Sequence, residues 1–163
     1  MRVTDIHRVL GEEVLKLANL RDVKIAAAES CTGGMPMTTL TDIPGSSVVV
    51  ERGFITYSNE AKVEMLGVAQ RLIDENGAVS ERVARAMAEG ALRESRADLA
   101  IAITGVAGPG ASGAKPEGMV CFGMAPDGEP VRTATVEFGA LGRDKVRAAA
   151  VHYALTMMQE ILA

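Results

Sequence analysis

LAIAI at Leu99–Ile103 is a continuous apolar run that ends at Thr104-Gly105, and it decides the fold class. Such a run, without alternating polar residues, is typical of a strand covered on both faces in an α/β protein. The next segment, 105–117, is a Gly/Ala/Pro/Ser loop without a helical face, and a second strand pattern follows over 119–125. Because a parallel crossover usually contains a helix, we predict that the second strand runs antiparallel to the first.

Further strand patterns lie on both sides of this pair. A turn over 126–130 leads into a strand pattern at 131–138, and the hairpin returns the chain to its earlier direction. Upstream, residues 23–28 and 53–57 have strand composition. The sequence therefore predicts a sheet of about five strands, of which the fourth is antiparallel.

Helical patterns separate these strands. The predicted helices run from Thr4, as N-cap, to about Asn19; from Thr32-Gly33-Gly34 toward Leu40; from Ser58 or Asn59 to Leu66; onward from the cap residue Ser80; and from about Arg143 to the end. We see neither an internal repeat nor a linker. These patterns predict an α/β fold, with the sheet between helices, as a single domain over residues 1–163.

The predicted topology also places a site. In open α/β sheets, ligands bind beyond the carboxyl ends of the parallel strands. We therefore expect residues from separate segments to meet at one edge of the sheet: Ser30, Tyr57, Lys62, Thr104 and Arg143.

Composition argues against several classes of partner. Asp and Glu number 21 and Lys and Arg 17, which gives a net charge of −4 at pH 7. With 3% aromatic residues and no Trp, the chain is a poor candidate for gripping a nucleic-acid backbone or stacking on bases. No apolar run approaches the ~20 residues that cross a bilayer. We expect neither nucleic acid nor membrane as a partner; a net charge of −4 still allows a local anion pocket.

Cys31 and Cys121 are too few for a disulfide scaffold and lack the spacing of metal ligands. No His/Cys/carboxylate cluster indicates a metal site, so no metal is expected. A hydrophobic fraction of 48% argues against a disordered chain. The sequence thus predicts a soluble protein of a reducing compartment, with the cytoplasm as its location.

Ser30 lies where a strand is expected to turn into a helix, directly before Cys31-Thr32-Gly33-Gly34. Glycines allow a sharp turn, and free N–H groups at a helix start suit an anion or a developing oxyanion. Ser30 is therefore a candidate nucleophile, although the segment by itself favours a serine N-cap with a packing turn. Cys31 competes for this role, because a helix N-terminus lowers the pKa of a thiol. Neither histidine of the chain is linked to this edge, which favours a buried, inert Cys31.

Lys62 is the fourth residue after Ser58, near the start of a short predicted helix. A lysine acts as a general base only when burial or a nearby cation, here Arg143, lowers its pKa. The alternative is a solvated helix lysine, which is the commoner case. Tyr57 is either an aromatic packed on the core or a hydroxyl that links Ser30 and Lys62.

Gly108, Gly110 and Gly113 form a literal G-x-G-x-x-G pattern. The dinucleotide fingerprint needs a helix directly after the glycines, whereas a strand pattern follows here. The loop is therefore either a flexible connection or a backbone nest for a phosphate. Arg143, at the start of the last helix, is either solvated or binds an anion.

Five segments carry a wider resemblance: AESCTGG at 28–34, RGFITYSNEAK at 52–62, GAVS at 77–80, TGVAGP at 104–109 and GRDKVR at 142–147. In this order they resemble the CinA C-terminal domain family. The resemblance implies a three-layer α/β/α sandwich with sheet order 2-1-3-4-5, and its antiparallel fourth strand agrees with the argument above. The chain departs from the family pattern at Met35-Pro36-Met37 and at Gly142.

The resemblance implies a role for each candidate residue. Ser30 would be the nucleophile and Lys62 its base, supported by Tyr57. Backbone N–H groups around Gly33-Gly34 or Gly105 would stabilise the oxyanion. The remaining substrate-binding candidates that the resemblance suggests are Thr32, Thr104, Gly108 and Arg143.

Active members of the family convert nicotinamide mononucleotide to nicotinate mononucleotide and ammonia. The resemblance therefore implies a Ser-Lys amidohydrolase that needs no metal or organic cofactor, acts on a nucleotide and forms a homodimer. The alternative is a catalytically silent nucleotide-binding module of the same family. A nucleic-acid-binding competence factor is disfavoured by the net charge.

Overall fold

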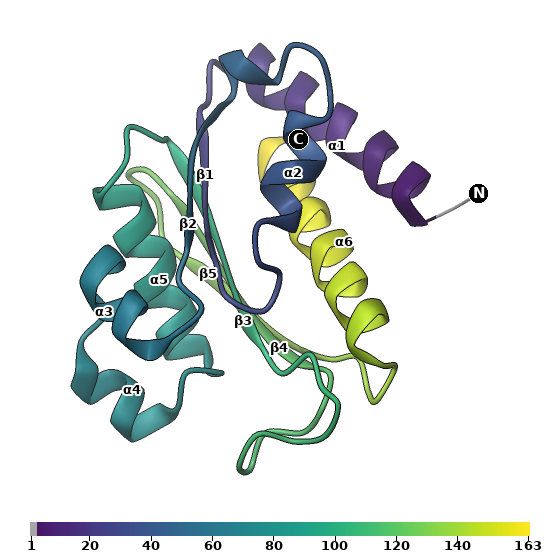
Figure 1. Ribbon diagram of the computed structural model, residues 1–163. Coiled ribbons are helices and arrows are strands. Elements are labelled where there is room, and N and C mark those ends of the chain that lie inside the picture. Colours follow the sequence, from purple (N-terminus) through teal and green to yellow (C-terminus); the bar gives the residue numbers. More distant parts are fainter. Residues whose placement is uncertain (1–2) are drawn as a thin grey trace.

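A mixed five-stranded sheet forms the centre of the computed structural model, which describes residues 3–163 (Figure 1). The strands are β1 (Ile25–Glu29), β2 (Val50–Ile55), β3 (Leu99–Gly105), β4 (Met119–Pro126) and β5 (Arg132–Glu137). They lie in the order β2-β1-β3-β4-β5, and β1 pairs in parallel with both β2 and β3. Strand β4 is antiparallel to β3 and to β5, which confirms the predicted order and direction.

Helices cover both faces of the sheet. They are α1 (Val3–Leu20), α2 (Met35–Thr41), the 3-10 helix η1 (Ser46–Val48), α3 (Asn59–Leu66), α4 (Gln70–Asn76), α5 (Glu81–Arg93) and α6 (Arg143–Leu162). Figure 1 shows α1, α2 and α6 on one face and α3, α4 and α5 on the other. The predicted α/β/α layering is therefore confirmed.

Successive side chains of β3 point to opposite faces of the sheet, and helices cover both faces, which explains why its sequence is apolar throughout. Leu99, Ile101 and Ile103 pack into the core beneath α1 and α6, whereas Ala100 and Ala102 pack toward α5. Small residues on this face allow α5 to approach the sheet closely. The approach is so close that a Cβ on Gly123 of the neighbouring strand would collide with the α5 backbone. Both faces of the strand are thus buried, as a central strand requires.

Local signals located some helix starts and missed others. Ser80 is the N-cap of α5, as predicted, and Ser58 rather than the alternative Asn59 is the N-cap of α3. The two serines accept from the N–H groups of Val83 and Ala61. Thr4 has helical backbone within α1, so the prediction that it is the N-cap was wrong, since an N-cap lies outside the helix. The sequence did not predict helix α4, which has seven residues and starts without a side-chain cap.

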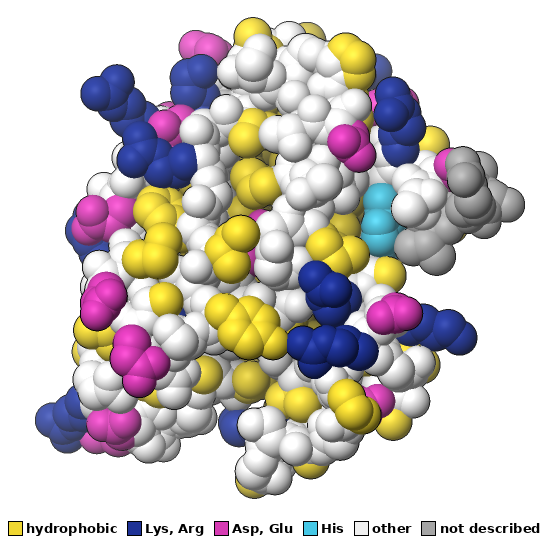
Figure 2. All heavy atoms as spheres, viewed as in Figure 1, with side chains coloured by type: hydrophobic (Ala, Val, Ile, Leu, Met, Phe, Trp, Pro, Cys, Tyr) yellow, Lys and Arg dark blue, Asp and Glu magenta, His cyan; other side chains and the backbone are white. Residues whose placement is uncertain are grey.

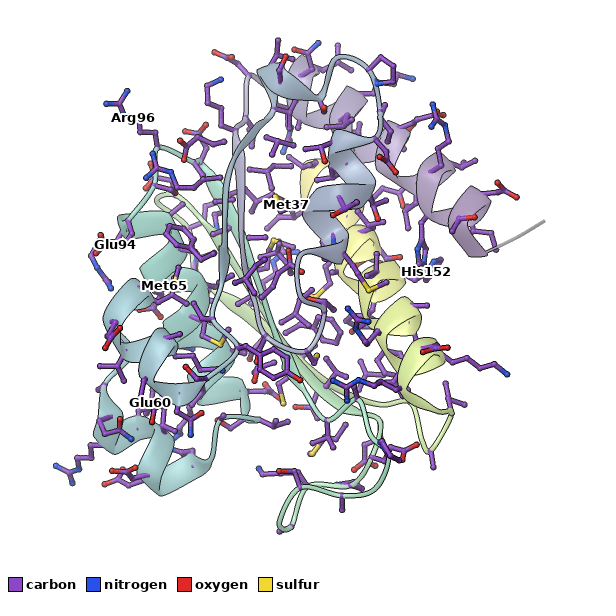
Figure 3. All side chains as sticks on the ribbon, in the orientation of Figure 1. Met37, Glu60, Met65, Glu94, Arg96 and His152 are labelled. Atoms are coloured by element: carbon purple, nitrogen blue, oxygen red, sulfur yellow. The ribbon has the colours of Figure 1, made fainter. Side chains whose placement is uncertain are left out.

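Strand β2 lies at the edge of the sheet and differs from its predicted range of 53–57. It starts at Val50 and ends at Ile55, because its pairing with β1 ends at Glu29. Thr56 adds one further bond, from its N–H to the Glu29 carbonyl, before the chain leaves the sheet. Met37 of α2 and Met65 of α3 lie on either side of this strand (Figure 3).

Candidate active site

Ser30 and Lys62 meet beyond the carboxyl ends of the parallel strands. Ser30 directly follows β1, and its N–H donates to the Ile103 carbonyl at 3.0 Å, which extends the β1–β3 ladder by one residue. Lys62 lies in the first half of α3, and its Nζ donates to Ser30 Oγ at 3.2 Å. The lysine is 1% exposed and the serine 8%. The structure therefore contains the predicted Ser-Lys pair in contact and shielded from water.

The chain between β2 and α3 curls around the Lys62 amine. Nζ donates to the carbonyls of Thr56 at 2.8 Å, Tyr57 at 3.3 Å and Ser58 at 3.5 Å. Ser58 can lie this close because it is the N-cap of the helix that carries Lys62. Burial lowers the pKa of Lys62, and Cys31 opposes this shift. The amine is thus closer to the neutral form that a general base needs.

Ser30 Oγ is oriented from two directions. It accepts from Lys62 Nζ, and its own O–H donates to the Tyr57 carbonyl at 3.4 Å. A separation of 3.2 Å between Oγ and Nζ allows direct proton transfer. The geometry suits a serine that attacks a carbonyl carbon while the lysine takes its proton.

Cys31 is buried, and burial raises the pKa of its thiol to about 11. A thiol with that pKa is protonated at neutral pH, whereas the nucleophilic form is the thiolate. Helix α2 starts only at Met35, and desolvation of the thiol outweighs the Arg147 and Lys62 charges, which lower its pKa. The structure supports Ser30 over Cys31 as the nucleophile.

The turn after Ser30 uses the left-handed backbone that its glycines allow. Gly33 and Gly34 have φ values of 54° and 103°. Their N–H groups are engaged inside the protein, by the Ser30 carbonyl at 3.1 Å and by Glu29 Oε1 at 2.9 Å. Neither glycine N–H is therefore free for an oxyanion in this structure.

The other expected oxyanion donor, Gly105, lies at the end of β3. The next residue, Val106, donates its N–H to the Met119 carbonyl on the β4 side. Neighbouring residues of an antiparallel pair direct their N–H groups to opposite sides, so the Gly105 N–H points toward the end of β1. Ser30 lies at that end, which keeps Gly105 as a candidate donor.

Tyr57, Gly108 and Arg143 form the rim of the site. The Arg143 guanidinium donates to the Gly108 carbonyl at 2.6 Å and to the Tyr57 hydroxyl at 2.9 Å. The tyrosine is 62% exposed, so it does not pack on the core, and its carbonyl rather than its hydroxyl contacts Ser30 and Lys62. Figure 2 shows basic side chains beside apolar surface over the N-terminal half of α6.

Two threonine candidates have buried hydroxyls that bond within the protein. Thr104 Oγ1 donates to the Ala78 carbonyl at 2.9 Å, which links the end of β3 to the segment before α5. Thr32 Oγ1 donates to Glu29 Oε1 at 2.7 Å. These bonds hold the loops around Ser30 and direct neither hydroxyl proton toward it.

Three polar residues around the site were not identified from the sequence. Glu29 accepts from the turn, and Arg147 donates from Nε to the Cys31 carbonyl at 3.0 Å. Glu117 accepts from the Gly110 N–H and from the Gly142 N–H, which joins the β3–β4 loop to the start of α6. The sequence pattern could have indicated two of these residues. Arg147 lies one helical turn after Arg143, and Glu29 ends an otherwise apolar strand.

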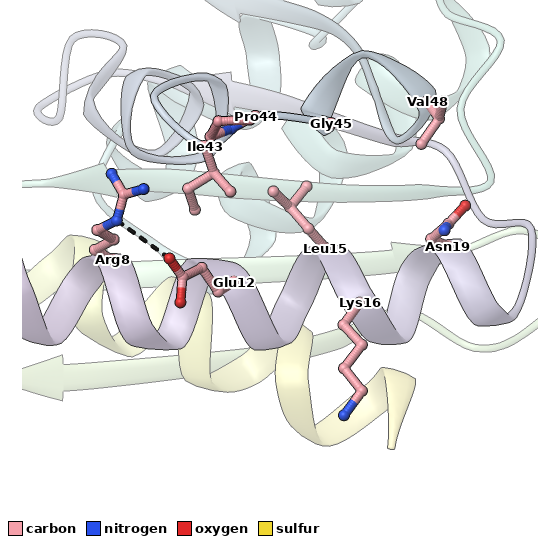
Figure 4. A pocket seen from close by; sticks show the side chains of 9 residues that line it. All are labelled: Arg8, Glu12, Leu15, Lys16, Asn19, Ile43, Pro44, Gly45 and Val48. Carbon is pink, nitrogen blue, oxygen red and sulfur yellow. Dashed lines mark hydrogen bonds and ion pairs between the residues drawn. The ribbon is translucent and has the colours of Figure 1, made fainter.

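A separate hollow lies at the opposite, amino-terminal ends of β1 and β2. It has a volume of about 420 Å³ and lies between α1 and the segment 43–48 (Figure 4). Leu15 and Ile43 supply its apolar wall, and Arg8 pairs with Glu12 at 3.1 Å on its rim. These groups form no nucleophile–base pair, so the chemistry is assigned to the Ser30 end.

Within residues 3–163, no group of three or more His, Cys, Asp or Glu side chains could hold a metal ion. Over the same residues, the helices lack the combination of length and apolar character needed to span a bilayer.

A family model supports the resemblance that the sequence motifs suggested. The model for the CinA C-terminal domain matches residues 7–162. This chain belongs to the CinA C-terminal domain family. The match includes the segments that carry Ser30, Lys62, Thr104 and Arg143.

Relatives of this CinA-family chain fall into two groups by length. A protein of Escherichia coli K12 named nicotinamide-nucleotide amidohydrolase PncC is 47% identical over 156 residues, which cover 94% of this chain and 93% of the relative. A putative competence-damage inducible protein of Symbiobacterium thermophilum is also 47% identical, over 161 residues. The alignment covers 94% of this chain but 38% of that relative, so the chain spans well under half the length of such longer relatives.

Solved structures of the family share the fold. A competence/damage inducible protein, CihA, of Agrobacterium tumefaciens superposes with a TM-score of 0.93 at 41% identity, over 96% of this chain and 95% of the other. A CinA superfamily protein of Klebsiella pneumoniae superposes with a TM-score of 0.91 at 32% identity, over 96% and 97%.

Proposed function

We propose that this protein is an amidohydrolase that converts nicotinamide mononucleotide and water to nicotinate mononucleotide and ammonia. The observation that carries the proposal is the contact of 3.2 Å between Ser30 Oγ and the buried Lys62 amine. The choice of substrate is supported by the Escherichia coli relative, whose name states this activity and which this chain matches over nearly its whole length.

The first half of the reaction forms an acyl-enzyme. Neutral Lys62 takes the proton of Ser30 Oγ as the oxygen attacks the carboxamide carbon, and a tetrahedral oxyanion forms. The C–N bond then breaks as Lys62 returns the proton to the leaving nitrogen, which departs as ammonia. The Tyr57 hydroxyl is a second conceivable proton donor, but it bonds to Arg143 at 2.9 Å, and it is the Tyr57 carbonyl that faces the Ser-Lys pair. Lys62 is therefore the assigned donor.

The second half repeats the same proton path with water. Lys62 takes a proton from a water molecule that attacks the ester carbon. Breakage of the C–O bond returns the proton to Ser30 Oγ and releases the carboxylic acid product. No step needs a metal or an organic cofactor.

The nucleotide is bound at the rim, in this proposal. Arg143 has five N–H donors, of which the bonds to Gly108 and Tyr57 use two, so others remain for a phosphate. The left-handed Gly108 and the loop around it lie next to this guanidinium. A homodimeric state and a cytoplasmic location complete the proposal, the latter supported by two free, buried cysteines.

The test is ammonia release from nicotinamide mononucleotide by the purified protein. We expect catalytic release in wild type and none in Ser30→Ala. If wild type binds the nucleotide without releasing ammonia, the chain is the silent binding module instead.

A further inference from the structure

Glu29 is a carboxylate in the core of the protein that the proposed reaction does not use. It ends β1, whose other residues are apolar, and is 1% exposed. Oε1 accepts from Thr32 Oγ1 at 2.7 Å and from the Gly34 N–H at 2.9 Å. The Met37 N–H also acts on the carboxylate, but Oε2 has no hydrogen bond of good geometry among residues 3–163. Burying a carboxylate with one oxygen unbonded costs stability. A role in the site would account for this arrangement.

The acceptors and donors around Glu29 hold the turn 30–34 from two sides. Glu29 accepts from the turn at two points, and Arg147 of α6 donates to the carbonyls of Cys31 and Thr32 at 3.0 and 3.3 Å. Between these anchors the chain takes the left-handed backbone of Gly33 and Gly34. The shape of the turn that carries Ser30 thus depends on a buried acid and a basic residue together.

Strand alternation separates Glu29 from Lys62. Ile25 and Ala27 pack into the core beneath α1 and α6, so Glu29 lies on that face of the sheet and Ser30 starts on the other. Lys62 comes from α3, which covers the opposite face (Figure 1). The groups that shift the pKa of Lys62 do not include Glu29. Glu29 therefore influences the pair through the turn and not through its charge on the lysine.

We propose that Glu29 is a positioning residue: its buried carboxylate fixes the 30–34 turn so that Ser30 Oγ stays within proton-transfer distance of Lys62 Nζ. This inference rests on the proposed Ser-Lys mechanism but not on the identity of the nucleotide.

The test compares Glu29→Gln, Glu29→Ala and the control Glu81→Ala. A glutamine keeps an oxygen for Thr32 and Gly34, whereas an alanine removes both bonds. Glu81 likewise accepts two hydrogen bonds, here from the Thr133 hydroxyl at 2.6 Å and the Thr135 hydroxyl at 2.7 Å, but these bonds lie between α5 and β5. Two readouts are used: steady-state kinetics with nicotinamide mononucleotide, and the rate at which a sulfonyl fluoride labels Ser30, followed by intact mass.

We expect Glu29→Ala to lose kcat by about 100-fold, because a small misplacement of a nucleophile is costly, with little change in KM. Its Ser30 labelling should slow in parallel, and Glu29→Gln should restore both rates to near wild type. Glu81→Ala should lower the melting temperature without changing either rate. Wild-type kcat in folded Glu29→Ala overturns the proposal, as does a glutamine variant as slow as the alanine variant.

The labelling rate separates this inference from the proposed substrate. If Ser30 of wild type is labelled but no ammonia is released, the substrate is wrong and the Glu29 variants still decide the inference. If folded wild type is not labelled at Ser30, both the nucleophile and the positioning role fail. Should Glu29→Ala not fold, Thr32→Val removes one of the two bonds without emptying the site and should slow labelling partially; an unchanged rate there overturns the role.

Discussion

At the scale of single residues, the Lys62 amine has three carbonyl acceptors and one serine hydroxyl around it and almost no contact with water. From the sequence, either burial or the Arg143 charge was expected to lower the pKa of Lys62. Burial is the cause, while the Arg143 guanidinium contacts Gly108 and Tyr57. Most helix lysines are solvated, whereas this one is buried, and its neighbours in the sequence do not indicate the burial.

Arginine should not replace this lysine as a base. A guanidinium stays protonated in proteins, so we expect Lys62→Arg to be nearly as inactive as Lys62→Met, although Arg keeps the charge. Because the neutral amine is the active form, wild-type kcat/KM should rise with pH through the lowered lysine pKa. The pH profile and the kcat/KM of both variants check this. Near-normal activity in the arginine variant would leave Lys62 as an electrostatic clamp.

The nucleophile assignment is tested at neighbouring positions. Ser30→Ala should reduce kcat by at least about 10³-fold and leave nucleotide binding intact, because the hydroxyl is lost while the pocket keeps its shape. Cys31→Ala is the matched control and should keep most activity, since its thiol is buried and protonated. Ammonia release and calorimetric binding measure the two effects. An inactive cysteine variant beside an active serine variant would reverse the assignment.

At the scale of elements, three connections build the site: the turn after β1, the segment from β2 into α3, and the β3–β4 loop. Glu117 joins that loop to the chain before α6 through the N–H groups of Gly110 and Gly142. This link explains how Arg143, at the first residue of α6, reaches the Gly108 carbonyl at 2.6 Å. The G-x-G-x-x-G pattern is therefore part of a loop held at the site, without the helix of a dinucleotide fold.

The start of α6 should act on the anionic part of the ligand. We expect Arg143→Ala to raise KM for nicotinamide mononucleotide by about 10-fold or more, the cost of a charge-assisted hydrogen bond, with a much smaller effect for nicotinamide riboside. Lys145→Ala, an exposed cation on the same helix, is the control and should change neither value. Steady-state kinetics with both substrates decide the point. Equal losses for both would assign Arg143 to the chemistry or the fold.

At the scale of the whole molecule, the buried amine links stability to pH. The folded-state pKa of Lys62 is lowered from 10.5, so the folded protein loses the lysine proton at a lower pH than the unfolded chain. Wild type should therefore gain stability relative to Lys62→Met as the pH rises from the folded-state pKa toward about 10.5. Urea unfolding of both proteins across that pH range measures the difference in their free energies of unfolding. The other titrating groups are the same in both proteins, so their contributions cancel in this difference. A constant difference would contradict a lowered pKa.

The exposed edge of the sheet at β2 is a candidate surface for association between copies of the chain. Among the described residues 3–163, β2 pairs with β1 alone. Exposed apolar side chains lie along this strand or beside it: Ile55 is 52% exposed and Met65 is 42% exposed. An apolar strand edge favours association, so we propose a second copy of this chain as its partner. Sedimentation equilibrium should give twice the chain mass of 17.1 kDa. A monomer mass at micromolar concentration would refute the homodimer.

Local patterns in the sequence determined that there are five strands, the direction of each strand and two helix caps, although the bounds of β2 differed from the prediction. The loop 105–117 has no helical face, which alone indicated that β4 is antiparallel to β3, and Ser58 and Ser80 cap the helices they precede. The family motifs identified Ser30 and Lys62. These features depend on backbone propensity and residue order, which neighbouring residues carry by themselves.

The assembly of the site depends on contacts between residues far apart in the sequence. Lys62 reaches Ser30, 32 positions earlier, because α3 packs on the sheet and buries the amine, and this burial also lowers its pKa. The bonds from Arg147 to the turn join residues more than 100 positions apart, and Glu29 lies buried beneath that turn. The charge state of a side chain depends on how far water is excluded from it, and a hydrogen bond depends on the distance between its atoms in space. A local pattern in the sequence encodes neither quantity.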